Sequence, residues 1–138
     1  MSEKITITAT VHADAKKTWD YYTKPEKITK WNFADPSWHC PSASNDMRVG
    51  GKYIARMEAK DGSFGFDFEA IYDAIKVGES FTYTMPDGRQ VDALFKKEGG
   101  DKTAVIISFD PEGENPLDLQ KAGWQAILDN FKKYTETN

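Results

Sequence analysis

Apolar residues recur at helical spacing along residues 116–134, the last long stretch of the chain. At about 100° per residue they fall on one side of a helix, and their arc of roughly 200° is about twice what a helix on one flat surface needs. The pattern predicts a helix that is enclosed on several sides. Asn115 is the expected N-cap, and Pro116 suits the first helical position. The apolar arc holds Leu117, Leu119, Gly123, Trp124, Ala126, Ile127, Leu128, Phe131 and Tyr134.

The beginning of the chain changes from strand spacing to helix spacing. Apolar and polar residues alternate over residues 5–11, which predicts a strand with one buried face. Helical spacing follows over residues 12–23, with Asp14 as the N-cap. Pro25 ends this helix, because proline denies the preceding residue a helical conformation. It also begins a second short helix over residues 26–31.

The middle of the chain predicts a series of antiparallel strands. Residues 32–46 are rich in proline and serine and are expected to form an irregular but ordered loop. The strands that follow are joined by short glycine-containing turns, and short connections imply antiparallel neighbours. The expected strands are 52–58, 64–70, 80–85, 89–97 and 103–110.

One face of the expected sheet is strongly aromatic and must be covered. The only element long and apolar enough to cover it is the helix at residues 116–134. A strongly twisted sheet of six to seven strands, curled around this helix, accounts for its wide apolar arc. The expected fold class is α+β, with two short helices after the first strand. The inner face carries Tyr53, Met57, Phe64, Phe66, Phe68, Phe81 and Tyr83.

Composition limits the cellular setting. The length of 138 residues predicts one domain, residues 1–138, and 39% hydrophobic with 29% charged residues is typical of globular proteins. No run approaches the roughly 20 apolar residues of a membrane span, and the N-terminal segment lacks the apolar core of a signal peptide. The single cysteine, Cys40, excludes an internal disulfide and fits a reducing compartment. These features favour a cytoplasmic protein without membrane insertion.

Charge and aromatic content narrow the function classes. The net charge is −4, with acids and bases interleaved, which argues against a nucleic-acid surface. Aromatic residues make up 13% of the chain. Large aromatics fill cores, but they also line concave ligand sites, and composition alone leaves both interpretations open.

Two amides and one histidine are possible polar groups of a site. Gln120 and Asn130 lie within the apolar arc, where they could orient a ligand or could bond to loops and water at the rim. His39 stands beside Cys40, but sequence neighbours rarely place both side chains on one centre. Two His and one Cys also fall short of the four ligands that zinc usually takes. A structural histidine is favoured, and no metal, triad or phosphate-loop signature is present.

Several short motifs occur in a characteristic order. They are Trp19, Pro25-Glu26-Lys27-Ile28 leading to Trp31, Gly50-Gly51-Lys52-Tyr53, Asp61-Gly62, Gly78-Glu79-Ser80-Phe81-Thr82-Tyr83 and Gly123-Trp124. Together they resemble the activator of heat-shock protein 90 ATPase homologue family, over essentially the whole chain. That family belongs to the START-like, Bet v 1-like (SRPBCC) superfamily. The resemblance implies a helix-grip fold, in which a curved sheet wraps around a C-terminal helix.

The resemblance also implies functions. Superfamily relatives bind sterols, lipids, hormones or polyketides between sheet and helix, and some are cyclases or hydrolases. The eukaryotic member after which the family is named carries a separate N-terminal domain and stimulates the chaperone's ATPase. The 138 residues leave no room for that domain, so a chaperone partner is the alternative expectation.

The leading expectation is binding of a small apolar or amphipathic molecule between sheet and helix, without a cofactor. Nothing in the sequence demands an enzyme. A cyclase or hydrolase would need a titratable residue in the pocket, and His39 and Tyr83 are the candidates. The candidate ligand-binding residues are Trp19, Trp31, Tyr53, Met57, Phe66, Phe68, Tyr83, Gln120, Trp124 and Ile127.

Overall fold

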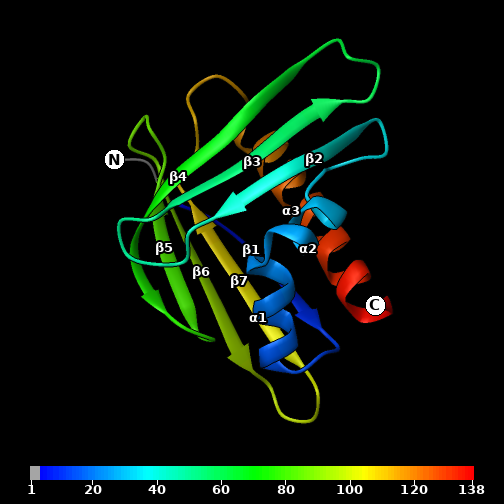
Figure 1. Ribbon diagram of the computed structural model, residues 1–138, viewed down its shortest axis with the longest axis vertical. Helices are drawn as coiled ribbons and strands as arrows, with labels where there is room; N and C mark the ends of the chain where they lie inside the picture. The colour runs from blue at the N-terminus through cyan, green and yellow to red at the C-terminus, as the bar shows by residue number, and fades with distance from the viewer. Residues whose placement is uncertain (1–3) are drawn as a thin grey trace.

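A computed structural model describes residues 4–138. Residues 1–3, which belong to the expected domain and to the segment compared with a signal peptide, lie outside the described residues. Figure 1 shows a curled sheet with three helices on its concave side. The elements are β1 (Ile5–Val11), α1 (Ala15–Thr23), α2 (Pro25–Trp31), β2 (Trp38–Asn45), β3 (Lys52–Ala59), β4 (Gly65–Lys76), β5 (Ser80–Thr84), β6 (Gln90–Lys97), β7 (Thr103–Phe109) and α3 (Leu117–Thr137).

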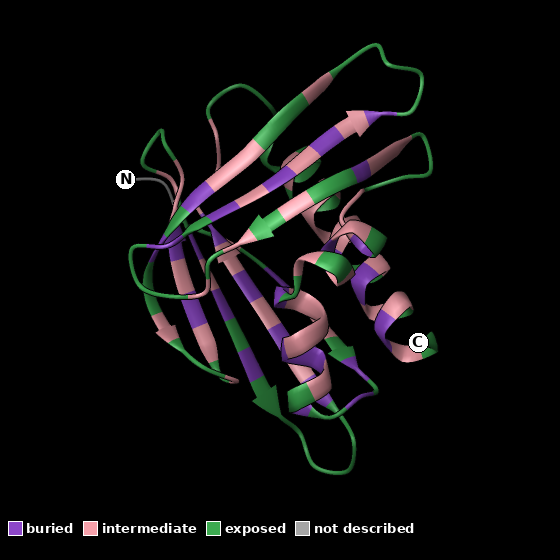
Figure 2. Cartoon of the chain, viewed as in Figure 1, coloured by how far each residue is buried: buried purple, intermediate pink, exposed green. Residues whose placement is uncertain are grey.

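All seven strands form one antiparallel sheet in the order β1-β7-β6-β5-β4-β3-β2. The sheet curls into a half-barrel, and α3 crosses its open side (Figure 1). Along β3 and β7, buried positions alternate with positions of intermediate exposure (Figure 2), as expected for a sheet with one apolar face. The predicted α+β architecture is therefore confirmed.

The prediction of an irregular loop over residues 32–46 is wrong for the second half of this segment. Trp38–Asn45 forms β2, an edge strand paired antiparallel with β3. The register shifts between His39 and Ser42, and Pro41 falls within this irregularity. Proline is tolerated at edges and bulges because no ladder hydrogen bond needs its missing N–H. An interrupted edge strand lacks the alternation that reveals a strand in sequence.

The two helix starts differ in how well they were predicted. Asp14 caps α1 as expected, because its Oδ1 accepts a hydrogen bond from Lys17 N at 2.8 Å. Asn115 does not cap α3, whose N-cap position is Pro116 without a side-chain bond. Gln120 reaches back from the first turns instead. Its amide accepts from the N–H of Glu112 at 2.8 Å and donates to the carbonyls of Glu112 and Asn115.

The helix α3 is enclosed along only part of its length. Its buried residues are Leu128, Phe131 and Thr135, whereas Leu117 and Leu119 are 58% and 59% exposed. The helices α1 and α2 contact the second half of α3, where Phe131 packs against Tyr22 and Trp31 and Tyr134 packs against Tyr21. The prediction that the whole apolar arc is covered is therefore wrong for the first turns.

The inner face of the sheet is also covered unevenly. Tyr53, Phe81 and Tyr83 are buried as predicted, but Phe64 is 61% exposed and Phe66 is 42% exposed. These two residues lie near the tip of the β3–β4 hairpin, which projects from the body of the molecule (Figure 1). Phe66 faces the predicted side of the sheet, where it lines the cavity described below, but neither ring is covered as the sequence pattern predicted.

Side chains of α3 bond to free backbone groups of the edge strand β1. Gln125 Nε2 donates to the carbonyl of Thr8 at 3.1 Å. Just beyond the strand, the N–H of His12 donates to Glu136 Oε2 at 2.8 Å. The helix therefore holds this edge through hydrogen bonds as well as apolar packing.

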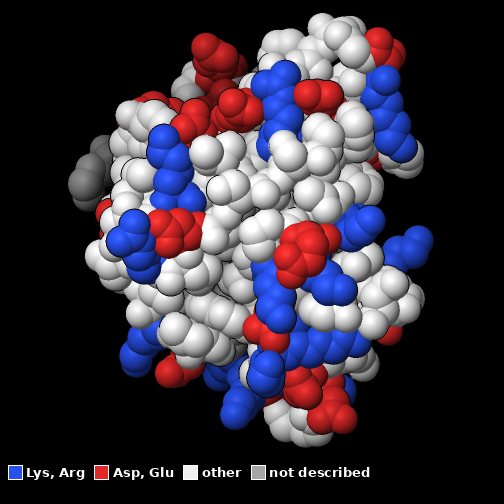
Figure 3. Space-filling model, in the orientation of Figure 1, with Lys and Arg blue, Asp and Glu red and all other residues white. Residues whose placement is uncertain are grey.

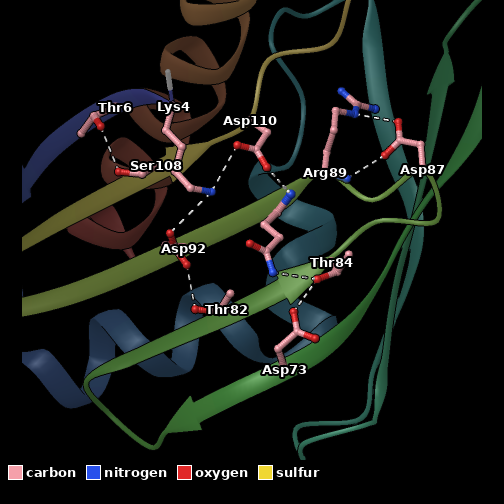
Figure 4. A network of polar contacts seen from close by, with 11 residues as sticks. Lys4, Thr6, Asp73, Thr82, Thr84, Asp87, Arg89, Asp92, Ser108 and Asp110 are labelled. Atoms are coloured by element: carbon pink, nitrogen blue, oxygen red, sulfur yellow. Dashed lines mark hydrogen bonds and ion pairs between the residues drawn. The ribbon is translucent and has the colours of Figure 1, made fainter. Parts of the chain in front are cut away.

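The outer face of the sheet is polar. Figure 4 shows Lys4 between two carboxylates, 3.4 Å from Asp110 and 3.8 Å from Asp92. Thr82 also donates to Asp92 at 2.7 Å. On the surface seen in Figure 3, Lys and Arg side chains are interspersed with Asp and Glu side chains. Within residues 4–138, no helix combines the length and the low polarity that crossing a bilayer requires.

Candidate ligand-binding cavity

A cavity of about 180 Å³ lies between the inner face of the sheet and the helices α1, α2 and α3. Its lining is drawn from β1, β3, β4, β5 and β7 and from all three helices. Most lining side chains are aromatic or aliphatic, and the polar groups of the lining residues are tyrosine hydroxyls, the amide of Asn32 and the indole N–H groups of Trp31 and Trp124. The site is therefore concave and mainly apolar, with a few polar groups.

The structure brings eight of the ten predicted site residues together around this cavity. Trp19 instead packs edge-on against Phe95 and Phe81, with centroids 5.1 and 6.0 Å away. Gln120 bonds to the loop before α3 and does not reach the cavity lining. The eight lining residues are Trp31, Tyr53, Met57, Phe66, Phe68, Tyr83, Trp124 and Ile127.

Sequence reasoning missed seven lining residues, and most of them carried a signal. The alternation of Phe66, Phe68 and Ala70 continues to Tyr72, so extending the strand would have found it. Others lay on predicted apolar faces without being singled out. Asn32 follows α2 in a loop and carried no signal. The seven are Ile7, Tyr22, Asn32, Tyr72, Phe81, Ile107 and Leu128.

The walls of the cavity are built from rings in contact. Tyr53 and Tyr83 stack with centroids 5.6 Å apart and planes 9° from parallel. Phe68 lies edge-on to Tyr83 on one side and to Trp124 on the other, at 6.1 Å in both cases. Pairs of this geometry hold each other in place, so the wall contributed by β3, β4 and β5 is stiff.

The cavity has a closed end and a more accessible rim. Trp31, Tyr72 and Ile107 are at most 2% exposed, and they form its buried part. Phe66 is 42% exposed, and Trp124 is half-buried. A small molecule would therefore enter beside the β4 hairpin and the first half of α3.

The hydroxyl of Tyr72 has protein partners. It donates to Asn45 Oδ1 at 2.7 Å, and Asn45 in turn donates to the carbonyl of Thr23. Burial raises the pKa of Tyr72, and the bond to Asn45 only partly opposes this rise. This tyrosine therefore stays neutral and holds β2, β4 and α1 together.

Comparison with known families identifies the chain. Residues 12–136 match the family described as Activator of Hsp90 ATPase homolog 1-like protein. The chain belongs to this family. A comparison with curated proteins found no significant match.

Solved structures of similar proteins agree with the family assignment. The AHSA1-like protein from Aeromonas hydrophila is 40% identical, with a TM-score of 0.90 over 97% of this chain and 92% of that one. Chr148 from Cytophaga hutchinsonii is 49% identical, with a TM-score of 0.84 over 98% and 93% of the two chains. CV1439 from Chromobacterium violaceum shares the fold at 19% identity, with a TM-score of 0.85 over 99% of both chains.

In this member of the Activator of Hsp90 ATPase homolog 1-like family, His39 and Cys40 stand outside the cavity lining. His39 Nε2 lies 3.7 Å from Glu58 Oε1 at the surface, while Cys40 is buried in the core. Burial raises the pKa of the Cys40 thiol, although hydrogen bonds from its surroundings lower it in part. A thiol held neutral is a poor nucleophile. Within residues 4–138, no three His, Cys, Asp or Glu side chains are grouped closely enough to hold a metal.

Proposed function

We propose that this domain binds a small apolar or amphipathic molecule in the cavity between the curved sheet and α3. The observation that carries the proposal is a cavity of about 180 Å³ whose walls are mostly rings and aliphatic chains. Ligand sites are usually concave and mainly apolar, with a few placed polar groups. The fold of the family supports ligand binding in general terms. Cytoplasmic location fits the proposal, because Cys40 is a free thiol.

Titration followed by amide NMR tests the proposal. A panel of lipids, flavonoids and polyketide-like compounds is added to the labelled chain. Shifts at Tyr53, Tyr83 and Trp124 are expected, because these residues line the cavity. Asp92 and Asp110 on the outer face are the reference positions and should stay unchanged. If no compound moves the cavity residues, or if both sets move alike, the proposal fails.

A second candidate function is interaction with a chaperone. It is favoured by the family description and by the exposed apolar side chains of Phe64, Leu117 and Leu119. A direct assay of the cognate chaperone's ATPase, with and without this chain, tests it. Stimulation that disappears in a Leu117→Ser, Leu119→Ser variant would support the interaction. An unchanged ATPase rate together with no detectable binding would reject it.

A cyclase or hydrolase is less well supported. Of the two titratable candidates, His39 stands outside the cavity lining and Tyr83 lies within it. Burial raises the pKa of Tyr83 well above its ordinary value. A phenol that holds its proton this firmly is a weak acid, and its phenolate is rarely formed near neutral pH. The geometry therefore favours binding over catalysis.

A further inference from the structure

Two tyrosine hydroxyls at the cavity lack protein partners. Tyr22 and Tyr83 both line the cavity, and within residues 4–138 neither hydroxyl has a hydrogen-bond partner. The only fully sealed side-chain oxygen without a partner in that range is Thr135 Oγ1. The two tyrosine hydroxyls therefore keep surface that a molecule in the cavity can touch. Buried hydroxyls are normally bonded, so these two are available to a ligand.

A third hydroxyl has a proton left to donate. Asn32 Nδ2 donates to the Tyr53 hydroxyl at 3.5 Å, so this oxygen is the acceptor and its own proton is unused. Burial raises the pKa of Tyr22, Tyr53 and Tyr83, so all three hydroxyls keep their protons. The rings of Tyr53 and Tyr83 stack with centroids 5.6 Å apart and planes 9° from parallel. Tyr22 and Tyr83 both contact the ring of Phe81, with centroids 6.1 and 5.5 Å away, so the three tyrosines stand together in one part of the cavity wall.

The cavity lining contains no Lys, Arg, His, Asp or Glu. A carboxylate entering it would lose its hydration without gaining a cation. The three tyrosines remain neutral and offer O–H donors. A neutral acceptor oxygen is therefore the group that this site satisfies best.

The volume limits the size of the ligand. The cavity measures about 180 Å³. An engineered apolar protein cavity of about 150 Å³ is large enough to bind benzene. One ring with a short substituent therefore fills the site, whereas a sterol-sized molecule would require the walls to move.

We propose that the cavity takes a compact, uncharged, single-ring molecule with a carbonyl oxygen, which the hydroxyls of Tyr22, Tyr53 and Tyr83 hold by hydrogen bonds. The inference rests on the proposed function, because it assigns the ligand class of the same cavity. It adds a recognition element that apolar packing alone does not supply. The carbonyl faces the tyrosines, and the ring contacts the aromatic walls.

Three probes of nearly equal shape test the inference. Acetophenone carries the carbonyl, α-methylstyrene replaces its oxygen by a methylene group, and benzoate replaces its methyl by a charged oxygen. Binding is measured by amide NMR and calorimetry. Acetophenone and α-methylstyrene should both bind, and benzoate should bind at least about tenfold more weakly than acetophenone.

Variants that remove single hydroxyls separate hydrogen bonding from packing. Tyr83→Phe and Tyr22→Phe keep the ring and should weaken acetophenone binding about three- to tenfold, with α-methylstyrene unchanged. Tyr21→Phe is the matched control. The hydroxyl of Tyr21 donates to the Asn138 carbonyl at the surface, outside the cavity lining. This control should leave the binding of all three probes as it is.

The outcomes distinguish the inference from the proposed function. If α-methylstyrene binds and Tyr83→Phe and Tyr22→Phe change neither probe, the cavity binds ligands but the hydroxyls do not recognise them, and the inference is overturned. Equal affinity for benzoate and acetophenone also overturns it. If none of the probes, and no compound of the broader panel, shifts the cavity residues, the proposed function fails together with the inference.

Discussion

The indole of Trp124 in α3 stacks on the ring of Phe109 in β7, with centroids 4.0 Å apart and planes 13° from parallel. Phe109 is 1% exposed, so the stack presses the helix onto the core of the sheet. The turns before it, with Leu117 and Leu119, remain exposed. The stack therefore fixes the part of α3 that lines the cavity.

Removing this indole should destabilise the fold. Trp124→Ala is expected to lower the free energy of unfolding by about 2–4 kcal/mol, because large-to-small changes lose packing and leave a void. Urea unfolding measures the change. Trp38→Ala is the matched control, since Trp38 contacts the exposed rings of Phe64 and Phe66. If Trp38→Ala lowered the free energy of unfolding by as much as Trp124→Ala, the stack of Trp124 on Phe109 would stabilise the fold no more than a surface contact does.

Two neighbouring phenylalanines should differ in binding. Phe64 and Phe66 both contact Trp38 and both are exposed, but only Phe66 lines the cavity. Phe66→Ala is expected to weaken ligand binding about fivefold, as the loss of one ring contact would. Phe64→Ala should leave affinity unchanged. The measurement is calorimetric titration with acetophenone. Equal effects of the two substitutions would place the binding site elsewhere.

Replacing either of two buried threonines by valine should change the free energy of unfolding in opposite directions. Thr135 Oγ1 has no partner within residues 4–138, whereas Thr18 Oγ1 donates to the Asp14 carbonyl at 2.8 Å. Both side chains are 0% exposed. Thr135→Val should raise the free energy of unfolding by about 1 kcal/mol, and Thr18→Val should lower it by a similar amount. Urea unfolding measures both changes. If both variants had a lower free energy of unfolding than the original chain, the Thr135 hydroxyl would have a hydrogen-bond partner.

One carboxylate on the outer face should make stability depend on pH. The N–H of Gln90 donates to Asp110 Oδ2 at 2.9 Å and lowers the pKa of this carboxyl; slight burial opposes the shift, and Lys4 adds to it. Because the folded pKa is the lower one, the stabilisation is full above the unfolded pKa of about 4. It is lost as the pH falls from there through the folded pKa.

The Asp110→Asn variant tests this dependence. Above about pH 5 the variant should be less stable than the original chain, and the difference should shrink as the pH falls towards about 2. Unfolding by urea across this range gives the comparison. A difference that stays constant with pH would show that Asp110 acts through shape and not through charge.

Sequence reasoning succeeded where one local pattern decides the structure. The Asp14 cap and the alternation that turns Tyr53 and Phe68 inward were both predicted, because capping and period-two alternation depend on near neighbours. Five of the eight predicted site residues that line the cavity are on strands and were found by this alternation, and the other three, Trp31, Trp124 and Ile127, were found by helical spacing. An inner-face position on a curved sheet is already close to the cavity.

Sequence reasoning failed where packing between elements distant in the sequence decides whether a residue is buried. A helical wheel gives the direction of Leu117 and Leu119 but not whether another element reaches them, and here none covers them. The wheel likewise placed Gln120 in the apolar arc, although its amide bonds to the loop before the helix. Trp19 faces inward as expected, but it packs on Phe95 instead of the cavity. These outcomes depend on tertiary geometry that periodicity does not encode.

The two edges of the sheet restrict how another protein could bind. Strand addition needs a row of free backbone N–H and C=O groups. At β1 the Thr8 carbonyl is already bonded to Gln125, and at β2 Pro41 has no N–H and lies in a register shift. Neither edge therefore offers a continuous template. A protein partner would recognise this domain by its side chains and not by its backbone.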